Sequence, residues 1–268
     1  MIRRRQRSEA FHLGPGLRYF AVDASLRKAP PSTVRSSAAA VSRRLAAGVD
    51  GSPLAVYAVD AGSLPAGRFA WCRLTLGADA PTAQGRWPDE LAAALASDLT
   101  GGAVALGIEA PLWWPVPPRQ GDLGKARRGE GDRPWSAGAG ATITPTAVTQ
   151  LAWILREVAR RCVLARPTFA TERVVVDPRA GDLLLWEAFV SRRGERGDTA
   201  RHSHDARAAA QEFARRAHDL PTAGSFPSDV EAPDGDVLNL AAAAATLAGL
   251  DLPSGAMTAT TTVVTAPP

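Results

Sequence analysis

The sequence predicts an α/β fold in which helices cover a mixed β-sheet. From about residue 80 onward, short apolar runs typical of buried strands alternate with longer amphipathic segments typical of helices. Before that point, two strand-like runs are joined by turn residues, which predicts an initial β-hairpin over 54–76. Together these observations favour one sheet with flanking helices.

The first elements are predicted from their local sequence. The run LAVYAVD at 54–60 predicts a strand, and RFAWCRLTL at 68–76 predicts its hairpin partner. Proline and acidic residues begin the segment 88–99, which predicts a helix that ends at a pair of glycines. The run AVALGIEA at 103–110 predicts the next strand.

The second half continues the alternation. A polar, glycine-rich stretch predicts a long loop at 115–141, and 144–165 is the clearest amphipathic helix in the chain. The remaining predictions are a strand signal, a turn and a buried strand over 172–191, a helix over 203–220 with Asp205 at its start, and a last helix over 234–250 with Asp236 as N-cap.

Charge and composition divide the 268 residues into three parts. Residues 1–47 hold ten Lys and Arg against two acids, and the rest holds 21 against 25, so the basic character belongs to the N-terminal segment. We therefore expect a basic, disordered extension at 1–53, a folded domain at 54–252, and a disordered Thr/Ala/Pro-rich tail at 253–268. A basic extension can attract nucleic acid, but a solvated tail, or translated sequence upstream of the true start, is the explanation we prefer.

The composition is that of a cytoplasmic protein. Cys72 and Cys162 form neither a disulfide framework nor a zinc pattern, which fits a reducing compartment. No hydrophobic stretch follows the basic start as a signal peptide would require. The longest apolar run, 238–250, is too short to cross a bilayer, so we expect no membrane partner.

Carboxylates at strand ends are the main functional signal. Asp60 ends the first strand and Glu109 ends the second buried one. If these strands are parallel neighbours, their backbones lie about 4.8 Å apart, and the two charges repel unless a cation lies between them. Mg²⁺ or Mn²⁺ suits such oxygen ligands. Glu187, late in a third apolar run, is the third expected metal ligand, and Asp236 completes the catalytic set, with Asp205 in reserve.

Each acid also has an ordinary structural explanation. Asp60 fits a turn, Asp236 fits a helix cap, and Glu187 fits an ion pair with a buried arginine. Substrate contacts are expected from Arg127, Arg128 and Arg133 in the basic loop and from Trp113, which follows Glu109 and can stack on a base. Packing of the loop is the alternative role for Trp113.

The residues LGIEAPL at 106–112, with the looser matches LWEAF at 185–189 and DVLNLAAAAA at 236–245, resemble the family named domain of unknown function 429. These are predicted nucleases of the ribonuclease H-like superfamily, and the resemblance covers 54–250. It implies a five-stranded sheet of order 3-2-1-4-5 with the second strand antiparallel, and a metal site drawn from Asp60, Glu109, Glu187 and Asp236. Glu109 stands where the family usually has Asp, and Ser191 and Asn239 stand where relatives often have acids.

Two hypotheses of function follow from these observations. The first is a metal-dependent nuclease or phosphodiesterase, in which carboxylates hold Mg²⁺ or Mn²⁺ and the substrate is RNA or DNA. The alternative is a non-catalytic binding or interaction module that keeps the fold with a lapsed metal site.

Overall fold

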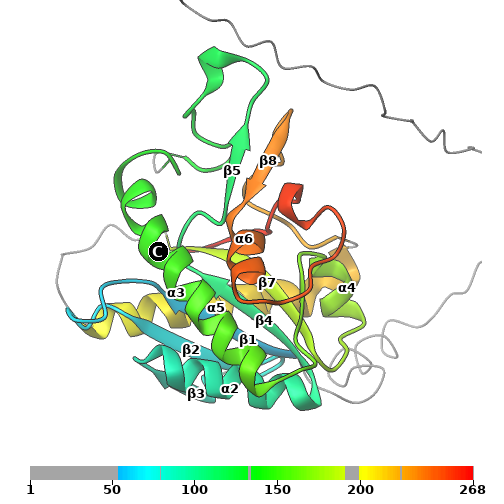
Figure 1. Ribbon diagram of the computed structural model, residues 1–268. Helices are drawn as coiled ribbons and strands as arrows, with labels where there is room; N and C mark the ends of the chain where they lie inside the picture. Colours follow the sequence, from blue (N-terminus) through cyan, green and yellow to red (C-terminus); the bar gives the residue numbers. More distant parts are fainter. Residues whose placement is uncertain (1–53, 79, 132–133, 191–198, 224, 268) are drawn as a thin grey trace, which may run out of the picture. The chain divides into compact units, whose positions relative to one another are not determined.

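The computed structural model describes residues 54–267 apart from 79, 132–133, 191–198 and 224. The basic extension expected at 1–53 lies outside the described residues, and so do Arg133 and Ser191. Within the described range, the chain is built on one large sheet with helices on both of its faces (Figure 1).

The large sheet is mixed. Its strands in the described residues are β1 (Leu54–Asp60), β2 (Ala70–Thr75), β3 (Ala83–Gly85), β4 (Ala103–Ile108), β6 (Arg166–Thr168), β7 (Asp182–Val190) and β9 (Val263–Ala266). The order is β3-β2-β1-β4-β7-β6, and β9 also pairs with β7. Strand β2 is antiparallel to β1 and β3, whereas β1, β4, β7, β6 and β9 run parallel to one another. The predicted α/β class and initial hairpin are therefore confirmed.

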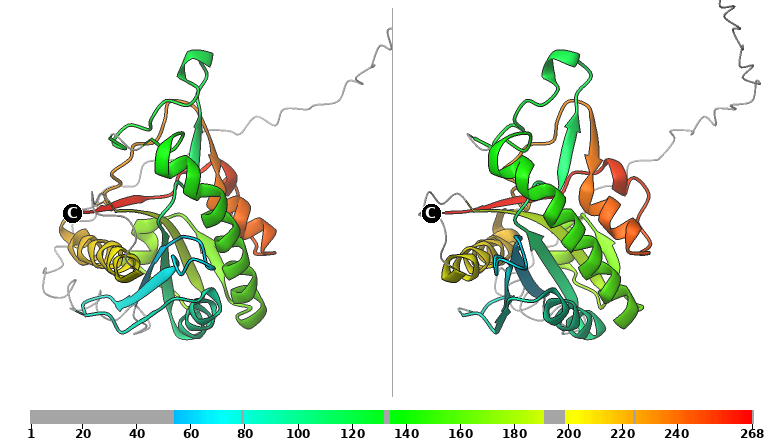
Figure 2. Two further views of the ribbon diagram at one scale, coloured as in Figure 1. Left: turned by 90° about the vertical axis from the view of Figure 1, so that its left-hand side faces the viewer. Right: turned by 60° about the vertical axis from the view of Figure 1, so that its left-hand side comes forward.

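Helices cover the two faces in separate groups (Figure 2). One face carries α2 (Pro88–Gly101), α3 (Gly138–Arg161) and α6 (Leu240–Leu247), and the other carries α4 (Thr171–Val176) and α5 (Thr199–Ala223). Because β1, β4 and β7 are buried on both sides, their sequences read as nearly continuous apolar runs. None of the helices in the described residues is long and apolar enough to cross a membrane.

A two-stranded ribbon extends beyond the end of the large sheet (Figure 1). It consists of β5 (Trp113–Val116) and β8 (Asp236–Asn239), which pair antiparallel. A short 3-10 helix, η1 (Gln120–Asp122), follows β5, so the expected loop over 115–141 contains regular structure. The expectation that Asp236 caps the last helix is wrong, since Asp236 lies at the start of β8 and Asn239 caps α6 by accepting a 2.8 Å bond from the Ala242 N–H.

Three further boundaries differ from the sequence prediction. Helix α3 begins at Gly138, six residues before the predicted start at 144, and includes Pro145. The β-branched run expected to form a strand near 172 forms helix α4 instead, because Val174 and Val175 pack against the core on the α5 face. Helix α5 begins at Thr199, which places Asp205 inside the helix and not at its N-cap.

The C-terminal segment is part of the fold. The expectation of a disordered tail at 253–268 is wrong for most of its length, because it contains a 3-10 helix, η2 (Ala256–Thr258), and strand β9. Strand β9 pairs with residues 187–190 of β7, beyond the stretch that β6 covers on the same edge. Val263, Val264 and Ala266 are fully buried, so burial of three apolar side chains stabilises a segment that looks featureless in sequence.

We predict that Val264→Ala lowers the free energy of unfolding by about 2 kcal/mol, because it removes two buried methyl groups and leaves a cavity. Val163→Ala is the matched control, since Val163 is 95% exposed, and it should change stability by less than about 0.5 kcal/mol. Urea denaturation measures both values. Equal small effects would mean that β9 contributes no stability.

Candidate functional site

Asp60 and Glu109 lie side by side at the carboxyl ends of β1 and β4. The two strands are parallel and paired up to Val59 and Ile108, and the Glu109 N–H donates to the Val59 carbonyl at 2.8 Å. Side chains alternate along a strand, so both carboxylates are in register on the α5 face. The predicted proximity of these two acids is therefore confirmed.

A cavity of about 310 Å³ opens next to this pair. Asp60 and Glu109 contribute its charged side chains. The other lining residues come from the segments after β1 and β4, from the first turns of α3 and from the end of β7: Ala61, Ala110, Pro111, Ala139, Gly140, Thr142, Ile143, Phe189 and Val190. The carboxyl edge of a parallel sheet is where ligand sites of α/β proteins usually lie, and this cavity is in that position.

Asp60 is paired with a histidine that sequence reasoning did not select. The Nδ1 atom of His202, on α5, lies 2.6 Å from Oδ2 of Asp60. Burial raises the pKa of the Asp60 carboxyl; His202 opposes this rise and Asp205 adds to it. The hydrogen bond to Asp60 in turn raises the pKa of His202 above its ordinary value of 6.5. The hydrogen bond to Asp60 therefore stabilises the protonated form of the imidazole relative to a free histidine.

Asp205 lies one helical turn after His202, so both residues are on the same side of α5. One of its carboxyl oxygens, Oδ2, accepts a 3.3 Å bond from Arg201, while the other, Oδ1, is buried with no hydrogen-bond partner in the described part of the chain. The spacing of His202 and Asp205 was a signal available in the sequence. This spacing is informative only if residues 202–205 are helical, and the predicted helix began at 203, after His202.

Glu187 does not join this site. It pairs in register with Ile108, which faces the opposite side of the sheet from Glu109. The β7 residue beside Glu109 is accordingly Ala188, which lies in the core on the α5 face. The expectation of Glu187 as a metal ligand next to Asp60 and Glu109 is therefore not supported by the geometry.

Glu187 belongs instead to a buried ion cluster, which we call the Arg127 cluster: Arg127, Glu130 and Glu187. Arg127 donates to Glu187 at 2.6 and 2.8 Å and to Glu130 at 2.8 Å, and the Leu112 N–H also donates to Glu187 at 3.0 Å. The three charged side chains are at most 1% exposed. Burial raises the pKa of Glu187, and Arg127 opposes the rise. The alternative of a buried arginine partner is the one that the structure favours.

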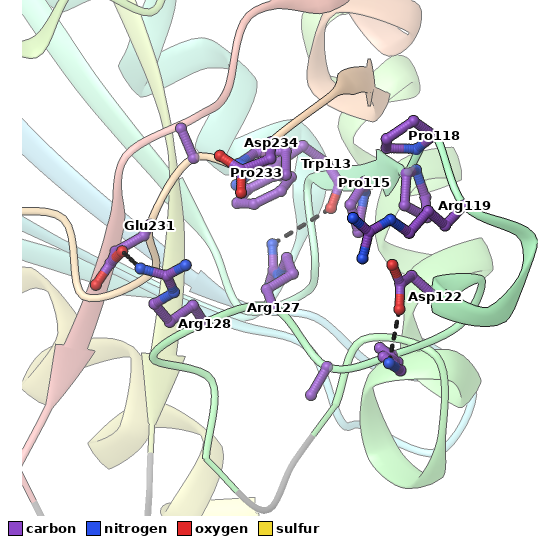
Figure 3. Close-up of a pocket in the computed structure, with 14 residues that line it drawn as sticks. Trp113, Pro115, Pro118, Arg119, Asp122, Arg127, Arg128, Glu231, Pro233 and Asp234 are labelled. Atoms are coloured by element: carbon purple, nitrogen blue, oxygen red, sulfur yellow. Dashed lines mark hydrogen bonds and ion pairs between the residues drawn. The ribbon is translucent and has the colours of Figure 1, made fainter.

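Three of the residues expected to contact substrate, Trp113, Arg127 and Arg128, line a second cavity, of about 390 Å³, beside the β5–β8 ribbon (Figure 3). Trp113 is fully buried, and the Cζ atom of Arg127 lies 4.5 Å from the centre of the Trp113 ring. Trp113 therefore packs the loop and cannot stack on a base. Arg127 faces inward to the Arg127 cluster. Arg128 is exposed but pairs with Glu231 at 2.8 Å, as Figure 3 shows.

The four expected catalytic acids thus occupy three places. Asp60 and Glu109 share a cavity, Glu187 is enclosed in the Arg127 cluster, and Asp236 is on the ribbon and lines neither cavity. In the residues that the structure describes, no group of three or more His, Cys, Asp or Glu side chains is arranged to hold a metal ion. The protein alone therefore offers a cation two neighbouring carboxylates, with Asp205 close to Asp60.

We predict that Arg127→Met lowers the free energy of unfolding by about 3–5 kcal/mol, because it leaves two carboxylates buried without a cation. The neighbouring Arg128→Met breaks only an exposed pair and should cost less than about 1 kcal/mol. Urea denaturation of the two variants provides the comparison. Similar losses would show that the Arg127 cluster is not desolvated.

A second prediction concerns pH. His202 has a higher pKa in the folded chain than in the unfolded chain, so the stability it contributes is complete below pH 6.5 and is lost as the pH rises through the folded value. His202→Gln should therefore flatten the fall in unfolding free energy as the pH rises above 6.5. The exposed His218→Gln serves as control and should keep the wild-type slope. An unchanged slope in His202→Gln would contradict the pairing with Asp60.

Comparison with known proteins gives no family to place beside this geometry. A scan against family models found no match, and searches of curated proteins and of solved structures found none either.

Proposed function

We propose that the chain is a metal-dependent phosphodiester hydrolase of the ribonuclease H-like type, with its active site at Asp60 and Glu109. The observation that carries the proposal is the placement of these two carboxylates on adjacent parallel strands, in register, at the mouth of one cavity. The strand order supports the fold assignment, since β3-β2-β1-β4-β7 with an antiparallel β2 is the order that the resemblance implies.

The donor set fits a hard divalent cation. Asp60 and Glu109 offer carboxylate oxygens, which Mg²⁺ and Mn²⁺ prefer over nitrogen or sulfur. Asp205, one turn of α5 from His202, has a buried Oδ1 atom that lacks a hydrogen bond in the described part of the chain, but this residue does not line the cavity and completes no three-ligand group there. When bound, the cation would polarise the phosphate and activate water. Glu187 and Asp236 have no part in this version of the site.

His202 supplies proton transfer in the proposed reaction. Its hydrogen bond to Asp60 fixes the orientation of the ring and raises the pKa of the imidazole. A proton donor with these properties suits the departing oxygen of a phosphodiester. Asp60 would thus act both as a cation ligand and as the group that orients His202.

A second candidate function is the non-catalytic module. The observations that favour it are the engagement of Glu187 by Arg127 and the lack of a three-ligand metal group in the described residues. Under this alternative, Asp60 and His202 form a structural ion pair, and the cavity serves binding alone.

Hydrolysis of bis(p-nitrophenyl) phosphate by the full chain separates the two candidates. We expect turnover with Mn²⁺ or Mg²⁺, none with excess EDTA, and a loss of about 100-fold or more in Asp60→Asn and in Glu109→Gln. Asp236→Asn, which changes an exposed carboxylate outside the cavity, should retain wild-type turnover.

The melting temperatures of all variants show whether the fold is retained. Turnover that survives in both Asp60→Asn and Glu109→Gln would refute the proposed site. No turnover by the wild-type chain with either cation would favour the non-catalytic module.

A further inference from the structure

The cavity at Asp60 and Glu109 has an unusual combination of walls for a site that handles phosphodiesters. Two acids lie at one end, and most of the remaining lining is apolar: Ala61, Ala110, Pro111, Ile143, Phe189 and Val190. No lysine or arginine is among the described residues that line it. These mostly apolar described walls suit a ligand that has an apolar part.

The side chains at this cavity offer fewer oxygen ligands than a magnesium ion needs, so other ligands would have to complete its coordination. Two neighbouring carboxylates hold Mg²⁺ only weakly by themselves, and the described residues provide no ready third ligand. Magnesium sites of this kind are typically completed by water and by phosphate oxygens of the substrate. The cation and a phosphate would therefore enter the site together.

The apolar wall offers a surface for a flat ring. Phe189 is half-buried at the end of β7, and Ile143 is half-buried in the second turn of α3. Stacking of a base on an aromatic side chain is favourable for every base, because each has a π-face. At about 310 Å³, the cavity is at the small end of the volumes of ligand sites, and this size is compatible with one nucleoside.

We propose that this cavity binds a single nucleoside phosphate together with a divalent cation, the base against Phe189 and Ile143 and the cation between the phosphate and the carboxylates of Asp60 and Glu109. The inference rests on the proposed function, for which it specifies the part of the phosphodiester substrate that the cavity holds, namely one nucleotide unit; 5′-AMP resembles this unit as a product would. A cation bound in this way would contact the carboxylates and the phosphate at once. Each ligand must then strengthen the binding of the other by the same factor.

Isothermal titration of the full chain tests this coupling. The probes are 5′-AMP, adenosine and ribose 5-phosphate, each titrated with about 5 mM MgCl₂ and again with EDTA in its place. We expect 5′-AMP to bind at least about tenfold more tightly with Mg²⁺ than with EDTA. Adenosine should show no response to Mg²⁺, and ribose 5-phosphate should bind at least about tenfold more weakly than 5′-AMP because it lacks the base.

Three variants locate the base. Phe189→Ala and Ile143→Ala should weaken binding of 5′-AMP with Mg²⁺, by about tenfold for Phe189→Ala. Leu238→Ala is the matched control, since Leu238 is an exposed apolar residue of β8 that does not line the cavity, and its affinity should equal that of wild type. Melting curves without ligand show whether each variant is folded. If Phe189→Ala does not fold, Ile143→Ala still tests the position of the base.

Affinity for 5′-AMP that is unchanged by Mg²⁺, or unchanged in both cavity variants, would overturn the inference. The hydrolase proposal fails separately, through absence of diester turnover. Turnover of bis(p-nitrophenyl) phosphate without coupled binding of 5′-AMP would support the hydrolase proposal and refute the nucleotide site. Coupled binding without any turnover would keep the nucleotide site and refute the hydrolase.

Discussion

The parallel register of β1, β4 and β7 is the constraint on which the rest of the structure depends. These strands are buried on both faces, so every side chain along them is committed to one of two separate cores. A shift of one residue in register would exchange the two faces. The same rule brings Asp60 and Glu109 together and sends Glu187, one position out of step with Glu109, to the opposite side of the sheet.

Once on that side, Glu187 requires a partner, and it receives one from a segment far away in the sequence. Arg127 and the Leu112 N–H both donate to its carboxylate, so a single side chain of β7 holds two points of the excursion between β4 and α3. Pro111 and the first turn of α3, at the two ends of that excursion, form walls of the cavity at Asp60 and Glu109. A carboxylate that does not reach the cavity thereby helps to set its shape.

The sequence was sufficient for features that depend on local patterns. The hairpin, α2 and β4 follow from apolar runs, turn residues and the Pro88 start, and the position of Asp60 next to Glu109 follows from the end points of two strands. The face that Glu187 occupies could not be predicted, because apart from Asp182 and Glu187 the run DLLLWEAFV is apolar and has no alternation to show which residues face which side.

The remaining differences have the same origin in long-range packing. Helix α4 is made of β-branched residues that favour a strand, and only its contact with the core on the α5 face decides otherwise. The spacing of His202 and Asp205 becomes informative only once this stretch is known to be helical and α5 brings His202 to Asp60. Asp236 looked like a cap, but its pairing partner in the ribbon, Val116, lies in a distant segment. Such pairings are invisible in a single sequence.

The late position of β9 along the chain affects how the protein can fold. During synthesis, β7 is complete long before residues 263–266 exist, and until they arrive one edge of residues 187–190 has no strand beside it. Exposed strand edges pair readily with other chains, and parallel pairings between distant segments form slowly. A nascent chain therefore passes through an interval in which aggregation competes with folding, and the docking of β9 ends that interval.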